Sequence, residues 1–223
     1  MTRIGVGRIA ALLLIGGAAV GYRLADAPPA SVKENRPALA LLTSLPLIFD
    51  EQFGLGGGGS PALARLERSY TVEPIAAADA ASLKGRRLLL MAHARAQPAE
   101  ALVELDAWVR EGGRVVLLAD PRLEWESSRP LGDALRPPPA FADSGLLVHW
   151  GLALGADDQG QGSFRRTGGQ CVPDEEDTVA RCAIGTGQAT IIADADFLML
   201  ERGDPAARHL DLLMAELARF ETR

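Results

Sequence analysis

The sequence predicts an α/β domain in which helices cover both faces of a mostly parallel sheet, preceded by an N-terminal membrane helix. Three observations lead to this prediction. Short, continuous apolar runs recur along the chain, as in strands that are buried on both faces of a sheet. Segments with helical apolar spacing lie between these runs, and an uncharged apolar stretch from Ile9 to Tyr22 precedes them all.

The composition is that of a globular protein and excludes several function classes. Hydrophobic residues make up 48% of the 223 residues and charged residues 23%. With 23 Lys+Arg against 29 Asp+Glu the net charge is −6, so we expect no nucleic-acid partner. Two cysteines and three histidines are too few for a disulfide-rich framework or a zinc-finger array.

Residues 1–27 have the features of a membrane anchor or a secretory signal. Arg3 and Arg8 precede the apolar stretch from Ile9 to Tyr22, which is shorter than the ~20 residues of a typical spanning helix unless it is counted from Ile4. We expect an uncleaved anchor. A cleaved signal is the alternative, because 25–27 (ADA) resembles a cleavage site, and a buried helix is the third possibility. Either of the first two places the rest of the chain on the periplasmic side of the inner membrane.

A Pro-rich polar linker, 28–36, leads into the main domain at 37–223. The first strand is expected at Ala38–Thr43, because Pro46 interrupts the apolar run that begins there. After a glycine-rich loop at 54–60, Ser60 and Pro61 form a helix start, with Ser60 as the N-cap. That helix runs to Tyr70, and a short strand, Thr71–Ile75, follows it.

Three further buried strands and two amphipathic helices complete the predicted core. The strands are Arg87–Ala92, Arg114–Ala119 and Ala189–Ala193, and the helices are Pro98–Glu111 and Pro205–Phe220. Strands that alternate with helices favour crossover connections and parallel pairing.

The segment between the third and the last of these strands is richer in loops. Residues 120–143 contain many prolines, and Leu146–Leu154 predicts a short helix to Trp150 followed by a short strand. A polar loop or hairpin insert occupies about 155–187. It contains Cys171 and Cys182, and outside the cytoplasm we expect these to form a structural disulfide. A free or metal-bound pair is the alternative.

Four segments resemble a known family. They are LLTSLPLIFDE (41–51), LDAWVREGGRVVLLADP (105–121), LLVHWGL (146–152) and ADADFL (193–198), and they occur in the order seen in auxiliary subunits of gliding-motility-type ABC transporters. The resemblance implies an extracytoplasmic domain with a flavodoxin-like fold similar to that of class I glutamine amidotransferases. It also implies an ABC transporter permease or ATPase as partner.

An amidotransferase-like enzyme would need a nucleophilic Cys on a sharp turn after a strand, paired with a His. The corresponding turn here, after Arg87–Ala92, is 93–95 (HAR), and both cysteines lie in the polar insert. We therefore expect no enzyme activity of this kind and no cofactor.

Polar residues follow the carboxyl ends of three predicted strands. His93, Asp120 and Asp194, with Asp196 close behind, fall at the edge where open α/β sheets bind ligands. They form our candidate ligand crevice. Asp194 and Asp196 can also bind a divalent cation, but we expect them to cap the following helix or bind loop amides instead, with no metal. His209, on the last helix, is expected to be partly exposed.

Three function classes remain. The first is a non-catalytic, membrane-anchored extracytoplasmic module that binds a partner protein in an ABC-type transport or envelope system, and it is our leading hypothesis. The second is a periplasmic domain that binds a small ligand or sugar in the crevice. The third is a divergent metal-dependent hydrolase that uses His93, Asp120 and Asp194.

Overall fold

The computed structural model describes residues 36–48, 59–199 and 207–221. The chain divides into two compact units, Met1–Arg36 and Pro37–Arg223, and the described residues belong almost wholly to the second. The predicted membrane segment and nearly all of the predicted linker lie outside the described residues. Within those ranges, every helix is too short or too polar to span a bilayer.

A seven-stranded sheet forms the centre of the domain, with the strand order β2-β1-β3-β4-β9-β8-β7. The first five of these strands pair in parallel, as predicted, and the last two are antiparallel. The parallel strands are β2 (Thr71–Pro74), β1 (Ala38–Thr43), β3 (Leu88–Ala92), β4 (Arg114–Leu118) and β9 (Gly187–Ile192). The antiparallel strands are β8 (Val179–Ile184) and β7 (Cys171–Pro173).

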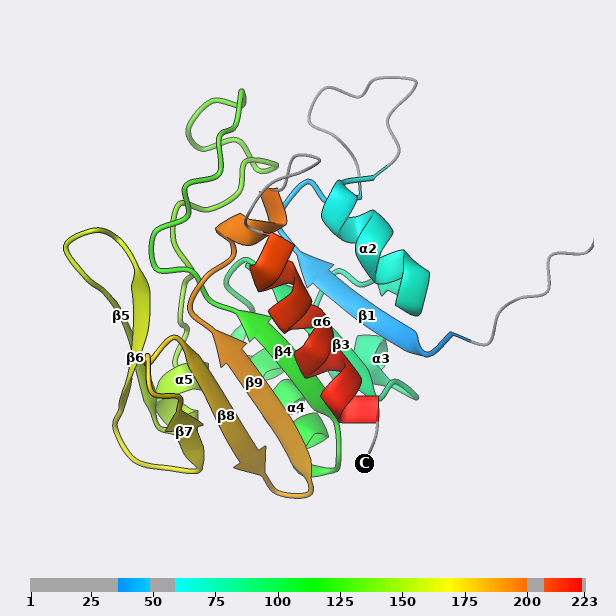
Figure 1. Ribbon diagram of the computed structural model, residues 1–223. Helices are drawn as coiled ribbons and strands as arrows, with labels where there is room; N and C mark the ends of the chain where they lie inside the picture. The colour runs from blue at the N-terminus through cyan, green and yellow to red at the C-terminus, as the bar shows by residue number, and fades with distance from the viewer. Residues whose placement is uncertain (1–35, 49–58, 200–206, 222–223) are drawn as a thin grey trace, which may run out of the picture. The chain divides into compact units, whose positions relative to one another are not determined.

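Helices cover both faces of the sheet, which confirms the predicted α/β architecture (Figure 1). One face packs against α2 (Pro61–Ser69) and α6 (Ala207–Glu221). The other packs against α3 (Ala80–Leu83), α4 (Ala99–Arg110) and α5 (Leu146–Trp150). Because both faces are covered, the strands carry continuous apolar sequences, and all five residues of β3 are buried.

The helix boundaries follow from local chemistry. The Ser60 hydroxyl accepts a hydrogen bond from the Leu63 amide at 3.1 Å, which confirms the predicted N-cap of α2. The predicted glycine pair ends α4. A Cβ on Gly113 would come within 2.4 Å of the Trp108 ring, so a larger residue there would have to displace that ring.

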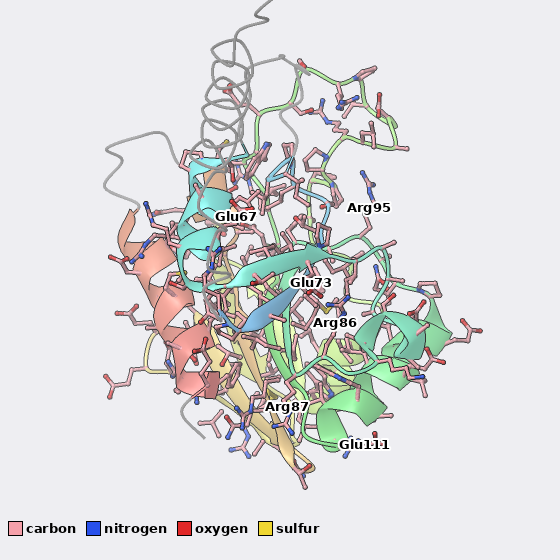
Figure 2. The ribbon with its side chains drawn as sticks, turned by 90° about the vertical axis from the view of Figure 1, so that its right-hand side faces the viewer. Glu67, Glu73, Arg86, Arg87, Arg95 and Glu111 are labelled. Atoms are coloured by element: carbon pink, nitrogen blue, oxygen red, sulfur yellow. A yellow bond between two sulfur atoms is a disulfide. The ribbon has the colours of Figure 1, made fainter. Side chains whose placement is uncertain are left out.

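An ion pair links β2 to the residues that precede β3. Arg86, just before β3, forms an ion pair with Glu73 of β2, and both lie on the side of the domain that faces the viewer in Figure 2. The same view shows α6 and α4 on opposite sides of the sheet.

The insert is more regular than predicted. A hairpin of β5 (Leu152–Ala156) and β6 (Gly162–Arg166) forms a separate two-stranded sheet, and β8 and β7 extend the main sheet. The residues of β8 alternate between buried and exposed along most of its length, as is typical of antiparallel strands. The sequence of β8 therefore contains no continuous apolar run of the kind that predicts the parallel strands. The four-residue helix α3 was also not predicted.

Candidate functional site

Three of the four predicted crevice residues come together at the carboxyl edge of the sheet. Asp120 and Asp194 each lie two residues beyond a paired position of neighbouring parallel strands, Leu118 of β4 and Ile192 of β9. Asp196 begins the 3-10 helix η1 (Asp196–Met199). One carboxylate oxygen from each aspartate lies within 4.8 Å of the others.

These carboxylates also hold the two loops together through backbone amides. Asp120 is buried, and its two oxygens accept hydrogen bonds from the amides of Arg122 at 2.8 Å and Ala195 at 2.9 Å. Asp194 accepts from the Asp196 amide at 2.9 Å, and Asp196 accepts from the Glu124 amide at 2.8 Å. The cluster therefore organises the strand-end loops, and the predicted binding of loop amides by Asp194 and Asp196 is confirmed.

The environment of the cluster changes the protonation of Asp194 and Asp196. Burial, followed by the charge of Asp120, raises the pKa of Asp196 to about 6. Burial also raises the pKa of Asp194, with the charge of Asp120 acting in the same direction. Asp196 therefore takes up a proton as the pH falls through about 6. The carboxylate oxygens of the cluster are of the type that binds divalent cations.

His93 does not line this crevice. Its side chain is fully buried, its backbone is left-handed at φ 47°, and its ring Nε2 lies 3.0 Å from the Pro138 carbonyl oxygen. The ring meets Phe141 edge-on, with 6.5 Å between centroids. Burial lowers the pKa of His93, although the Pro138 carbonyl and the charge of Asp120 oppose the shift. The ring holds the 120–143 segment against the sheet, which corrects its predicted place in the crevice.

The His93 ring has one further feature. Among the described residues its Nδ1 is the one buried side-chain nitrogen or oxygen without a hydrogen-bond partner. A neutral ring that donates from Nε2 to Pro138 leaves Nδ1 as an unprotonated acceptor. This arrangement agrees with the lowered pKa, because protonation would place an unpaired N–H in the core.

An open pocket of about 530 Å³ adjoins the aspartate cluster and shares Asp194 with it. Its other acidic lining residues come from the turn between β7 and β8, and its apolar residues come from β8, β9, η1 and α6. The acidic set is Asp174, Glu175, Glu176 and Asp194, and the apolar set is Val179, Ile192, Phe197 and Leu212.

His209 of α6 is the residue at this site that sequence reasoning missed. Its Nδ1 lies 3.2 Å from Oδ2 of Asp194, and its ring meets Phe197 edge-on at 6.1 Å between centroids. The His209 side chain is 57% exposed, in agreement with the predicted partial exposure. The sequence carries no local signal for the pairing, since Asp194 and His209 belong to different elements.

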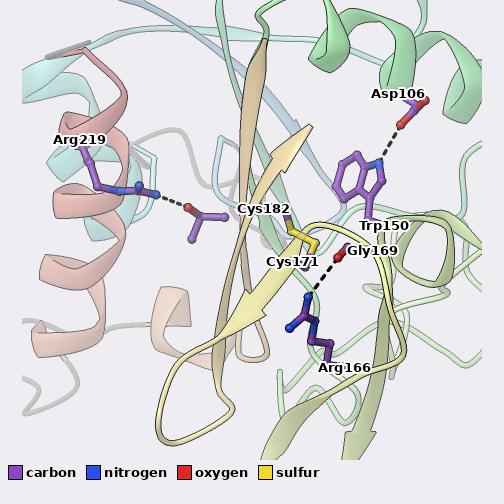
Figure 3. The surroundings of a disulfide bond; sticks show 8 residues. Asp106, Trp150, Arg166, Gly169, Cys171, Cys182 and Arg219 are labelled. Carbon is purple, nitrogen blue, oxygen red and sulfur yellow. Dashed lines mark hydrogen bonds between the residues drawn. A yellow bond between two sulfur atoms is a disulfide. The ribbon is translucent and has the colours of Figure 1, made fainter. Parts of the chain in front are cut away.

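The predicted disulfide is confirmed. Cys171 and Cys182 are directly opposite each other in β7 and β8, both are buried, and they are bonded (Figure 3). The bridge attaches β7, which ends the sheet, to β8. Because both sulfur atoms are in this bond, neither cysteine offers a thiolate nucleophile.

A buried carboxylate fixes α6 to the antiparallel part of the sheet. Glu216 accepts hydrogen bonds from Arg181 of β8 at 2.6 Å, from the Thr190 hydroxyl of β9 at 3.0 Å and from Arg219 at 2.7 Å. Burial by itself raises the pKa of Glu216, but these hydrogen bonds outweigh burial and hold the pKa below its usual value. The network is structural, and it forms one boundary of the pocket through Arg181.

Comparisons with known proteins yield distant structural likenesses. No family model matches the chain, and no curated protein matches it. Among solved structures, the mmIFT52 N-terminal domain is 11% identical with a TM-score of 0.49, over 82% of this chain and 97% of that one. Exo-beta-1,4-mannosidase Op5Man5 from Opitutaceae bacterium strain TAV5 is 14% identical with a TM-score of 0.41, over 84% of this chain and 35% of that one. The chain thus spans about a third of the length of that glycosidase.

Proposed function

We propose that the chain is a non-catalytic, membrane-anchored extracytoplasmic domain that binds a partner protein in an ABC-type transport or envelope system. The observation that carries the proposal is the buried Cys171–Cys182 disulfide. Structural disulfides persist in oxidising compartments and are rare in the cytoplasm. The bridge therefore supports a domain exported behind the apolar N-terminal run, on the periplasmic side of the inner membrane.

The strand order of the sheet supports a flavodoxin-like fold. The five parallel strands have the order 2-1-3-4-5 when numbered along the chain, which is the flavodoxin-like order. We propose on this basis the amidotransferase-like fold that the resemblance to the transporter auxiliary subunits implies. The turn after β3 carries His93, Ala94 and Arg95 in place of a nucleophile, which supports a binding role for the domain.

The test is purification of the full-length protein from detergent-extracted membranes of its native host, with mass spectrometry of bait and partners. An ABC permease or ATPase that co-purifies with bait retaining residues 1–27 supports the proposal. Bait that begins after Ala27 and carries no partner overturns it.

The pocket beside Asp194 favours a second candidate, a periplasmic domain that binds a small ligand. Its volume of about 530 Å³ lies within the range of small-molecule sites. This candidate predicts a rise in melting temperature with a ligand from a metabolite library and no stable protein partner. A metal-dependent hydrolase, the third class, would instead show activity that depends on a divalent cation and is lost in Asp120→Asn.

A further inference from the structure

We propose that His93 is an acid-sensitive latch, and that protonation of its ring releases the returning arm of the 120–143 segment, residues 136–143, from the edge of the sheet. The segment connects β4 to α5 and contains no helix or strand. The His93 ring is fully buried, and its Nε2 lies 3.0 Å from the Pro138 carbonyl oxygen of the returning arm. A titratable side chain therefore connects the end of β3 to this arm.

The second ring nitrogen makes this connection sensitive to protonation. A carbonyl oxygen only accepts hydrogen bonds, so Nε2 carries the proton of the neutral ring and Nδ1 is an unprotonated acceptor. Nδ1 is buried and, within the described ranges, has no hydrogen-bond partner. A protonated ring would place the N–H of a charged group at this position with nothing to accept it. The protonated ring is therefore stable only where its Nδ1–H can reach water.

The groups around His93 do not compensate for this burial. Asp120, at the end of β4, is the charged group that acts on the ring, and its charge favours protonation. The end of β1 contributes the uncharged Ser44, whose hydroxyl donates to the His93 carbonyl, and the returning arm contributes the Phe141 ring. Burial outweighs the Pro138 hydrogen bond and the charge of Asp120, and it lowers the pKa of His93 below its ordinary value of about 6.5.

The sign of this shift gives the direction of the response. A lowered pKa means that the closed arrangement binds the proton less tightly than an open one. The closed arrangement is therefore fully favoured above about pH 6.5 and loses stability as the pH falls from there toward the lowered pKa of His93.

The returning arm can open while the sheet stays paired. The Phe141 amide donates to the Asp120 carbonyl at 2.7 Å, so this arm lies beside the first residues of the segment. The backbone of His93 is held separately, because its own amide donates to the Leu118 carbonyl at 3.1 Å. Loss of the ring contact and of the Phe141 bond would therefore free the arm, leave β3 and β4 in register and expose the backbone beside Asp120.

The test is hydrogen exchange of backbone amides in the full-length protein in detergent between pH 7 and pH 5, with each rate corrected for its intrinsic pH dependence. We expect protection at the amides of Leu123 and Phe141 to fall by up to about tenfold per pH unit below pH 6.5. The amide of Val116, inside β4, is the reference and should keep its protection. His93→Gln, whose side-chain amide can donate to Pro138 but does not titrate, should show no such fall.

Two comparisons separate His93 from the other groups that titrate in this range. The chain has three histidines, so His149→Gln/His209→Gln leaves His93 as the remaining one and should keep the response of the wild type. Burial raises the pKa of Asp194 and raises that of Asp196 to about 6, so acidification favours the folded state at both carboxyls. Their titration therefore has the opposite sign to the expected loss of protection.

Three results would overturn the proposal. The first is protection at Leu123 and Phe141 that does not change with pH, and the second is an equal fall in His93→Gln. The third is an equal fall at Val116, because the whole domain would then be unfolding. If His93→Gln does not fold, His149→Gln/His209→Gln decides: a retained response supports the latch and a lost response overturns it.

Discussion

The ring of His209 lies 3.2 Å from the carboxylate of Asp194, so the first turns of α6 contact the loop at the carboxyl end of β9. This contact joins the aspartate cluster to the pocket, because Asp194 belongs to both. A ligand in the pocket would therefore change the electrostatic surroundings of the cluster. The two features act as one candidate site at the edge of the sheet where open α/β folds bind ligands.

Replacing Asp196 should stabilise the protein in a pH-dependent way. The folded-state pKa of Asp196 is raised to about 6, above its unfolded value. The folded state therefore binds the proton more tightly, and this contribution to stability is present below about pH 4 and lost as pH rises through 6. Asp196→Asn should raise the melting temperature at pH 8 and leave it nearly unchanged at pH 4. The exposed Asp158→Asn is the control, and equal shifts at both pH values would contradict the account.

Removing the disulfide should lower stability without abolishing the fold. The bridge closes a short loop at the sheet edge, and loss of such a loop constraint costs about 3 kcal/mol. We expect Cys171→Ala/Cys182→Ala to lower the free energy of unfolding by about this amount in urea titrations. Reductant should not affect the variant. A loss below about 1 kcal/mol would show that β7 is held mainly by its other contacts.

Truncation of the buried Glu216 side chain should lower the free energy of unfolding. Its side chain is 6% exposed and is shared by Arg181, Arg219 and Thr190. Truncation removes the common partner of two guanidinium groups that are 41% and 32% exposed, so water can solvate them and the expected loss is that of charge-assisted hydrogen bonds, about 1.5–3 kcal/mol. Urea unfolding of Glu216→Ala should show this loss. The exposed Asp211→Ala on the same helix should cost far less, and similar losses for both would contradict the assigned role.

His93 should hold the proline-rich segment rather than bind a ligand. The amides of Leu123 and Phe141 donate to Pro139 at 2.9 Å and to Asp120 at 2.7 Å, and the His93 ring bonds the neighbouring Pro138. His93→Ala should therefore speed hydrogen exchange at both amides. The exposed His149→Ala is the control. Unchanged exchange in His93→Ala would show that the segment is held without the ring.

The parallel core was predictable from the sequence because burial on both faces demands continuous apolar strands. β3 and β4 show this most plainly, and the Ser60–Pro61 helix start depends only on local chemistry. β7 and β8 were not separated from the polar insert, because an antiparallel strand near the sheet edge alternates in burial and its sequence is only partly apolar.

Parallel strands end at one edge of a sheet, so the sequence predicts that Asp120 and Asp194 share an edge. Their contact also requires β4 and β9 to be adjacent, and the sequence pattern does not specify that strand order. His93 lies at the same edge, but its ring is buried because its backbone is left-handed and its Nε2 hydrogen-bonds the Pro138 carbonyl. Its position just after a strand predicts neither of these two features. The pocket joins an acidic turn to the first turns of α6, and a pairing across so many residues leaves no periodic signal in the sequence.

The most direct test of partner binding is co-purification of the full-length protein from detergent-extracted membranes of its native host. The account predicts an ABC permease or ATPase together with bait that retains residues 1–27. No partner, together with bait that lacks residues 1–27, would contradict the account.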